Sequence, residues 1–140
     1  MSSLGVPFTD ATLEARVKAG IEEIESQLAA AVDSPDAFVA EAAAHLLNAG
    51  GKRFRPLLVM LAAEFGDQAH PDVPRAAVVV ELTHLATLYH DDVMDEASMR
   101  RGAPSANSRW GNSVAILVGD YLFGVAGLLF YRSEMLQSIG

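Results

Sequence analysis

The chain has 140 residues, of which 51% are apolar and 20% are charged, and its formal net charge is −8. This length and composition suit a single domain with a buried core, which excludes an intrinsically disordered protein. An acidic protein repels phosphate backbones, so general nucleic-acid binding is not expected. The chain has no cysteine, which excludes disulfides, thiolate nucleophiles and zinc–cysteine sites.

Two segments bear on the cellular location. The N-terminal sequence lacks the basic region and apolar core of a signal peptide, so we expect a cytoplasmic protein. Residues 114–131 form an apolar stretch whose length is near the lower limit for crossing a bilayer, but Asp120 lies inside it. Because an aspartate is costly within a bilayer, we expect a buried helix of a soluble domain and no stable membrane span.

Apolar residues at steps of three and four predict the first helix. The positions on its apolar face are Leu13, Val17, Ile21, Ile24, Leu28 and Val32. Ser34 and Pro35 can end this helix and start the next, with serine as the cap and proline at the first helical position. The second helix covers residues 36–49 and is ended by Gly50 and Gly51.

Three further helices are expected, with short breaks between them. Pro56 opens the first of them, which runs through Phe65, and its leucine, methionine and alanine favour a helix over a buried strand. The longest helix begins at Pro74 and runs to about Asp95. A break at residues 102–105 precedes a last helix that starts near position 113. No run alternates with period two for long enough to predict a sheet, so the fold class is all-α.

An acidic motif lies at the end of the longest predicted helix. At 100° per residue, His84, Asp91 and Asp95 fall within about 40° of one another, and Asp92 lies to one side. Like charges this close, near the negative end of the helix dipole, destabilise the helix unless something offsets them. Magnesium offsets them, because it binds one or two carboxylates and takes substrate phosphates as further ligands. Taken alone, the motif is equally well explained as a solvated acidic helix end.

Two neighbouring arginines favour the metal–phosphate interpretation. Arg100 and Arg101 follow the motif closely, and guanidinium groups can donate paired hydrogen bonds to phosphate oxygens that the metal leaves free. Val80, Thr87 and Leu88 lie below the aspartates on the same stripe of the helix. An apolar wall beneath a charged mouth suits a substrate with a charged head and a hydrocarbon tail.

A basic loop connects the second and third predicted helices. Gly51 lets the backbone approach a ligand closely, and Pro56 leads into a helix N-terminus, which favours anions. Lys52 and Arg55 can bind a second phosphate group, whereas Arg53 can simply point to solvent. The spacing is not that of a Walker A loop. Taken alone, the loop is at least as well explained as a plain helix–helix connection with surface charge.

Together these segments resemble trans-type polyprenyl diphosphate synthases, over roughly residues 35–123. The resemblance rests on the order and spacing of Gly-Gly-Lys-Arg-Phe-Arg-Pro, Glu-Leu-Thr-His-Leu-Ala-Thr-Leu-Tyr-His-Asp-Asp-Val-Met-Asp, Arg-Arg-Gly-Ala-Pro-Ser, Trp-Gly-Asn and Val-Gly-Asp-Tyr-Leu-Phe. It implies the N-terminal part of the all-α isoprenoid-synthase helical bundle, usually a homodimer. It also implies an enzyme that condenses isopentenyl diphosphate with an allylic diphosphate, using magnesium (Mg2+).

The resemblance implies roles for the residues of both motifs. Asp91 and Asp95 would hold Mg2+ on the allylic diphosphate, with Asp92 completing the motif. Arg100 would contact the allylic diphosphate, and Arg101 would contact isopentenyl diphosphate. The rest of the isopentenyl diphosphate site would consist of Gly51, Lys52, Arg55 and His84. Positions just before the first aspartate shape the tail pocket in this family, and the small residues there, which favour a longer product than a farnesyl-type enzyme makes, are Ala86 and Thr87.

The chain departs from the family pattern in two respects. Family members are much longer and carry a second aspartate-rich motif, whereas Asp91 and Asp92 form the only Asp-Asp pair here. Residues 124–140 also leave the family pattern. We therefore expect residues 1–140 to form a single truncated domain with a divergent tail. Such a domain would have little activity alone and would expose apolar faces.

Two other functions stay open. One is a non-catalytic binding or regulatory subunit of a heteromeric synthase, in which this chain is one half of a heterodimer. The other is part of a class I terpene cyclase, which also uses an aspartate-rich motif. The basic loop disfavours the cyclase, because a cyclase does not need Lys52 and Arg55 for a second diphosphate.

Overall fold

The computed structural model describes residues 4–133, which form six α-helices and one short hairpin. The helices are α1 (Ala11–Val32), α2 (Ala37–Asn48), α3 (Phe54–Ala63), α4 (Asp72–Met94), α5 (Ala106–Trp110) and α6 (Asn112–Arg132). The hairpin pairs β1 (Met99–Arg100) with β2 (Ala103–Pro104) in antiparallel register. The all-α prediction is confirmed. Residues 134–140 of the predicted divergent tail lie outside the described residues.

The first two helices begin at aspartate caps. The side chain of Asp10 accepts hydrogen bonds from two backbone N–H groups at the start of α1, at 2.9 and 3.0 Å. Asp36 caps α2 in the same way, at 2.9 and 3.1 Å. The predicted cap at Ser34, with Pro35 as the first helical residue, is therefore wrong by two residues. Asp36 is the stronger cap because its carboxylate also favours the positive end of the helix dipole.

The short helix α5 was not expected from the sequence. It lies between the predicted break and the predicted last helix, and it begins at Ser105, whose hydroxyl accepts a hydrogen bond from the N–H of Ser108 at 3.3 Å. A helix of five residues has too few turns to show a periodic apolar pattern. The last helix itself starts at Asn112, one residue from the predicted position.

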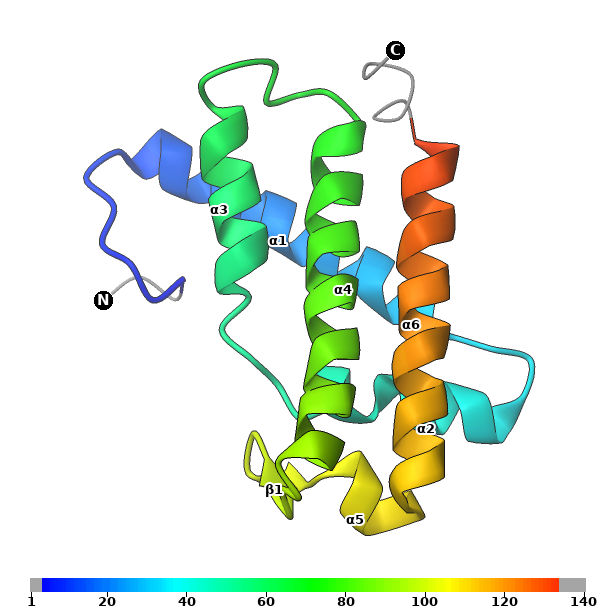
Figure 1. Cartoon of the computed structure of the whole chain (residues 1–140). Helices are drawn as coiled ribbons and strands as arrows, with labels where there is room; N and C mark the ends of the chain where they lie inside the picture. Colours follow the sequence, from blue (N-terminus) through cyan, green and yellow to red (C-terminus); the bar gives the residue numbers. More distant parts are fainter. Residues whose placement is uncertain (1–3, 134–140) are drawn as a thin grey trace.

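α4 is the central element of the bundle (Figure 1). α3 and α6 lie on either side of it, and α1 crosses behind these helices. α2, α5 and the hairpin gather near the C-terminal end of α4. Most of the core residues of α4 are completely buried, including Leu82, Leu85, Ala86 and Tyr89. The acidic motif therefore lies at the end of a helix that packs into the core along most of its length.

A glycine allows α4 and α6 to approach closely. A Cβ atom at Gly119 would lie 2.3 Å from Nε2 of His90 and 3.2 Å from the carbonyl oxygen of Ala86. His90 Nε2 lies 2.9 Å from the carbonyl oxygen of Ile116 and 3.3 Å from a carboxylate oxygen of Asp120. The aspartate that interrupts the apolar stretch is thus paired with a histidine on the neighbouring helix.

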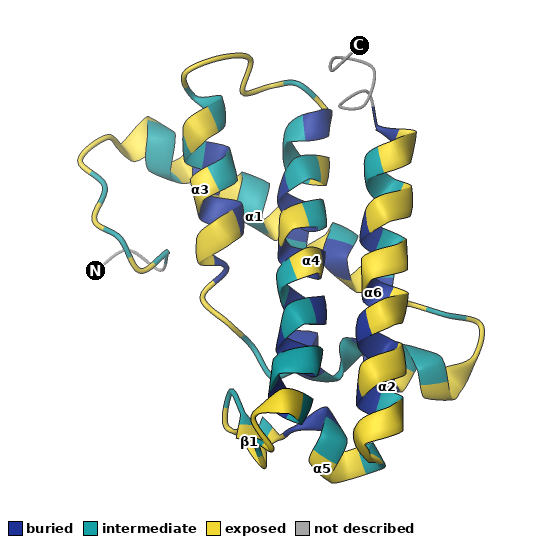
Figure 2. Cartoon of the chain, viewed as in Figure 1, coloured by how far each residue is buried: buried dark blue, intermediate teal, exposed yellow. Residues whose placement is uncertain are grey.

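α6 packs only one of its faces on the core. It is long and apolar enough to cross a membrane by length and composition, and 28% of its most apolar window is buried. Figure 2 shows its outer face as largely exposed, and the exposed large apolar side chains there include Leu117, Phe123, Leu128 and Tyr131. The helix expected to be buried is therefore buried on one side, and the expectation of exposed apolar faces is met.

A buried tyrosine joins α2 to α4. The hydroxyl of Tyr89 donates to the carbonyl oxygen of Ala42 at 2.6 Å and accepts from the N–H of Leu46 at 3.2 Å. These are two backbone groups that an uninterrupted helix would bond to each other. Burial raises the pKa of Tyr89 to about 12. Because α2 leads directly into the basic loop, this contact fixes the start of the loop against α4.

Candidate functional site

The acidic motif divides into two solvent-facing carboxylates and one buried carboxylate. Asp91 is half-buried and Asp95 is exposed, whereas Asp92 is completely buried. Asp95 is the C-cap of α4 and donates its N–H to the carbonyl oxygen of Asp91 at 2.8 Å, so the two residues lie one helical turn apart. The structure therefore places Asp91 and Asp95 together, as the spacing predicts, and turns Asp92 into the protein.

The buried carboxylate is paired with the first of the two neighbouring arginines. Arg100 donates to Oδ1 of Asp92 from Nε at 2.9 Å and from Nη2 at 2.5 Å. Within the described chain, Oδ2 of Asp92 has no hydrogen-bond partner. The hydrogen bond to Asp92, followed by the charges of Asp92, Asp91 and Asp95, raises the pKa of Arg100. Asp92 thus positions Arg100 beside the two outer carboxylates.

Two carboxylates fit a magnesium ion that shares its ligands with a substrate. Among residues 4–133 there is no group of three or more histidine, cysteine, aspartate or glutamate side chains arranged to hold a metal. Magnesium needs fewer protein ligands, since it is usually held by one or two carboxylates together with water and phosphate oxygens. Asp91 and Asp95 meet that requirement. Asp92 does not, because it is completely buried and one of its oxygens is paired with Arg100.

The basic loop between α2 and α3 has an unusual backbone. Gly50 and Gly51 have positive φ angles of 101° and 142°, and Arg53 adopts the left-handed conformation with a φ of 49°. The left-handed conformation is unfavourable for an arginine. Lys52 and Arg55 on either side of it are exposed. The loop therefore alternates outward-pointing cations with a residue that turns inward.

Arg53 is an internal residue, and the interpretation that it points to solvent is wrong. Its guanidinium is paired with Glu25 of α1 and lies 3.5 Å from the carboxylate of Glu81 in α4. It also donates to the carbonyl oxygens of Leu47 at 3.2 Å and Gly50 at 3.3 Å. These bonds satisfy the end of α2 and explain how the left-handed backbone is maintained.

Arg101 belongs to the basic loop rather than to the acidic motif. Its guanidinium donates to the carbonyl oxygen of Leu46 at 2.9 Å and also to that of Gly50. One of its nitrogens lies 3.9 Å from Glu81. Burial, followed by the nearby charge of Arg53, lowers the pKa of Arg101. The two consecutive arginines therefore contact two different parts of the fold.

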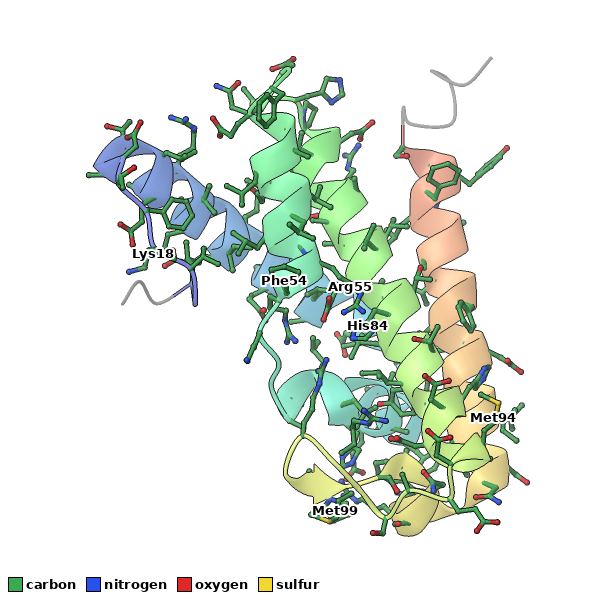
Figure 3. The ribbon with its side chains drawn as sticks, turned by 60° about the vertical axis from the view of Figure 1, so that its left-hand side comes forward. Lys18, Phe54, Arg55, His84, Met94 and Met99 are labelled. Atoms are coloured by element: carbon green, nitrogen blue, oxygen red, sulfur yellow. The ribbon has the colours of Figure 1, made fainter. Side chains whose placement is uncertain are left out.

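A cleft of about 390 Å³ lies between α3 and α4. Figure 3 shows Arg55 of α3 next to His84 of α4, and both residues line the cleft. Its lining also contains Val79, Val80, Thr83 and Thr87. Burial, and then the positive charges of Arg55, Arg101 and Arg100, lower the pKa of His84, so its imidazole is neutral at pH 7. The cleft combines a cation and a neutral hydrogen-bonding ring with an apolar wall.

Among the other residues proposed from the sequence, Lys52 and Ala86 do not line this cleft. Lys52 is exposed on the loop. Ala86 is completely buried on α4, with its carbonyl oxygen facing Gly119 of α6. Thr87 does line the cleft, and its hydroxyl donates to the carbonyl oxygen of His84 at 2.6 Å. Of the two residues proposed for the tail pocket, only Thr87 borders this cleft.

Comparison with known proteins identifies the family of the chain. The family model described as polyprenyl synthetase matches residues 36–138. The chain belongs to the polyprenyl synthetase family. Within this family it is 52% identical to nonaprenyl diphosphate synthase of Mycobacterium tuberculosis over 131 residues, which are 91% of this chain and 38% of the relative. It is 49% identical to heptaprenyl diphosphate synthase component 2 of Geobacillus stearothermophilus over 100 residues, which are 71% of this chain and 31% of the relative.

Solved structures of polyprenyl synthetases have the same fold over this region. Heptaprenyl diphosphate synthase from Staphylococcus aureus matches with a TM-score of 0.80 and 34% identity, over 87% of this chain and 40% of that structure. Geranylgeranyl pyrophosphate synthase from Corynebacterium glutamicum, solved with calcium and isoprenyl diphosphate, matches with a TM-score of 0.77 and 49% identity, over 91% of this chain and 38% of that structure. The chain spans about two fifths of the length of these proteins. The predicted family and partial coverage are confirmed.

Sequence reasoning missed two buried charged residues next to the basic loop. Neither Arg53 nor Glu81 was given a role, although Arg53 is 9% and Glu81 only 2% exposed. A signal for Glu81 was present, because it falls on the same helical stripe as Val78 and Leu85, which are core positions. A charged residue on a core stripe needs a buried partner. No comparable signal marks Arg53, whose burial depends on a left-handed backbone.

Proposed function

We propose that this chain carries the N-terminal half of the active site of a prenyltransferase that condenses isopentenyl diphosphate with an allylic diphosphate. The observation that carries the proposal is that two consecutive arginines point to two different parts of the site. Arg100 lies at the acidic end of α4, while Arg101 lies at the basic loop. Two anion sites side by side are what a condensation of two diphosphates requires.

The chain's own residues would bind and orient the two substrates. Asp91 and Asp95 would hold Mg2+, which when bound neutralises the charge that develops on the leaving diphosphate. Arg100 would bind the allylic diphosphate and is kept in place by Asp92. The second diphosphate would be bound by Gly51, Lys52, Arg55, His84 and Arg101. The apolar wall at Val79 and Val80 would contact hydrocarbon next to that site.

The half-site also accounts for the low activity that we propose for residues 1–140 alone. Relatives contribute about three fifths of their length from outside the matched region. An open cleft admits water, which would quench a reactive allylic cation. We therefore expect no prenyl transfer when the isolated chain is mixed with magnesium, isopentenyl diphosphate and geranyl diphosphate. Efficient transfer by this chain would contradict the half-site proposal.

Binding of geranyl diphosphate tests the acidic site directly. Isothermal titration calorimetry should show binding by the wild-type chain in the presence of magnesium. The Asp91→Ala and Asp95→Ala variants should each bind about tenfold or more weakly, because each loses a carboxylate that holds the metal. Glu22→Ala is the control, since Glu22 is an exposed acid of α1. Unchanged binding by both aspartate variants would refute the site.

A second candidate function is a subunit that binds diphosphate but requires a partner for catalysis. The exposed apolar face of α6 favours it, because a soluble monomer rarely exposes so many large apolar side chains on one helix. One relative is itself named as a component of heptaprenyl diphosphate synthase. Light scattering would report whether this chain forms a homodimer, and a strictly monomeric chain would favour a different partner chain.

A further inference from the structure

A buried carboxylate lies behind the basic loop. Glu81 of α4 is 2% exposed, and its ion-pair partners are Arg53 and Arg101. Burial raises the pKa of Glu81, whereas the charges of Arg53, Arg101 and Arg55 lower it. A carboxylate in such a position is destabilising unless it serves the cations around it.

Glu81 lies between two arginines that share an unfavourable backbone conformation. Arg53 and Arg101 have φ angles of 49° and 54°, and they are two of the three non-glycine residues with positive φ in the described chain. Their guanidinium groups lie 3.5 and 3.9 Å from the Glu81 carboxylate. The arginines come from separate loops, 48 positions apart in the sequence. One carboxylate thus faces two strained residues, whose guanidinium groups also donate to the same carbonyl oxygen, that of Gly50.

Gly51 is exposed, and the same two guanidinium groups lie against one side of it. A Cβ atom at this position would lie 2.7 Å from Nη1 of Arg53 and 2.9 Å from Cζ of Arg101. Two nitrogens of Arg101, Nε and Nη2, make no hydrogen bond with residues 4–133. The backbone of the loop therefore runs past two fixed cations, of which Arg101 keeps donors free, whereas every nitrogen of the Arg53 guanidinium already donates to Glu25, Leu47 or Gly50. This is a preformed surface for a phosphate group.

We propose that Glu81 is a positioning residue that holds Arg53 and Arg101 on either side of Gly51 and thereby preforms the site for the second diphosphate. This inference rests on the proposed function. Glu81 does not touch the diphosphate itself. It orders the two arginines before the ligand arrives, so the loop loses less freedom when it binds an anion.

Whether substitution of Glu81 strengthens or weakens diphosphate binding distinguishes a positioning role from a purely electrostatic one. As a negative charge near an anion site, Glu81 repels diphosphate, so Glu81→Gln would strengthen binding if charge alone mattered. As a positioning residue it acts in the opposite direction, because without its charge the two guanidinium groups repel each other and leave their places. The positioning role therefore predicts weaker binding after a change that makes the site more positive.

The experiment measures two ligands by calorimetry on the same chain. Isopentenyl diphosphate without magnesium reports on the basic loop, and geranyl diphosphate with magnesium reports on the acidic site. Glu81→Gln should weaken the binding of isopentenyl diphosphate by about tenfold or more and change the binding of geranyl diphosphate by less than about threefold. Glu81→Asp keeps the charge on a shorter side chain and should weaken the binding of isopentenyl diphosphate by an intermediate factor. Glu22→Gln, an exposed acid on α1, controls for loss of one negative charge.

The outcomes distinguish this inference from the proposed function. If the wild-type chain binds isopentenyl diphosphate and both Glu81 variants bind it equally well or better, the positioning role is refuted and the proposed function stands. If the wild-type chain binds neither ligand, the proposed function fails and the inference fails with it. Circular dichroism shows whether each variant is folded. If Glu81→Gln does not fold, Glu81→Asp decides the question alone.

Discussion

Tyr89 supplies a hydrogen bond that can be removed with almost no change in shape. Its side chain is completely buried, and its hydroxyl bonds to the carbonyl oxygen of Ala42 and the N–H of Leu46. Tyr89→Phe leaves two buried backbone groups without their partner. An unsatisfied buried group costs about 1–3 kcal/mol. Because the two groups can partly bond to each other as in a regular helix, we expect a loss of about 1–2 kcal/mol in the free energy of unfolding near pH 8.

The same residue predicts how stability changes at high pH. The pKa of Tyr89 is raised from 10.0 to about 12 by burial, so the folded state binds the phenolic proton more tightly than the unfolded state. A raised pKa gives stability that is fully present below pH 10 and is lost as the pH rises toward 12. At pH 11 the loss amounts to about 1.4 kcal/mol, because one pKa unit corresponds to about 1.4 kcal/mol.

Urea unfolding at pH 8 and pH 11 measures both effects. Tyr89→Phe cannot ionise at this position, so its deficit relative to the wild type should shrink by about 1.4 kcal/mol between the two pH values. Tyr121→Phe is the matched control, since Tyr121 is exposed on α6, and it should differ from the wild type by less than about 0.5 kcal/mol. A deficit for Tyr89→Phe that is equal at both pH values would refute the reasoning.

Three further substitutions test the packing and the ion pair around the site. Gly119→Ala places a Cβ atom 2.3 Å from His90 and should destabilise the fold by about 1–3 kcal/mol, whereas Gly124→Ala on the same helix meets nothing within 4 Å and should stabilise it by up to about 1 kcal/mol. Equal melting temperatures for the two variants would contradict the close approach of α4 and α6. Asp92→Asn removes the charge that holds Arg100, whose side chain is 31% exposed, and should cost about 1–2 kcal/mol in urea unfolding. An unchanged midpoint would mean that this pair contributes nothing to stability.

The fold was largely predictable because its long helices carry a periodic apolar pattern. α1 buries four of the six residues on its predicted apolar face, and the ends of α1 and α4 fall within about two residues of the expected positions. The misplaced cap at Ser34 shows the limit of local rules, since Asp36 offered a competing cap two residues later. α5 shows a second limit, because its existence depends on Ser105 and on contacts with other helices rather than on its own periodicity.

The sequence predicts which residues form the candidate site but not the direction in which their side chains point. Helical geometry places Asp91 and Asp95 together, and the structure agrees. The same geometry puts Asp92 about 100° away without saying whether that side faces solvent or the protein. The answer depends on Arg100, which returns to α4 through a hairpin whose path the sequence does not reveal. The burial of Arg53 likewise depends on a backbone conformation that arginine disfavours.

The hairpin explains how two sites from distant parts of the chain are kept in register. β1 ends at Arg100, which is fixed to Asp92, and the next residue has a left-handed backbone that turns its side chain toward Gly50 and Leu46. A single peptide bond therefore joins the side of the acidic motif to the end of α2. Any movement of the basic loop relative to α4 must break the hydrogen bonds of one arginine or the other. The separation between the two proposed diphosphates is thus set by the backbone of the chain, while the identity of each ligand is set by the side chains around it.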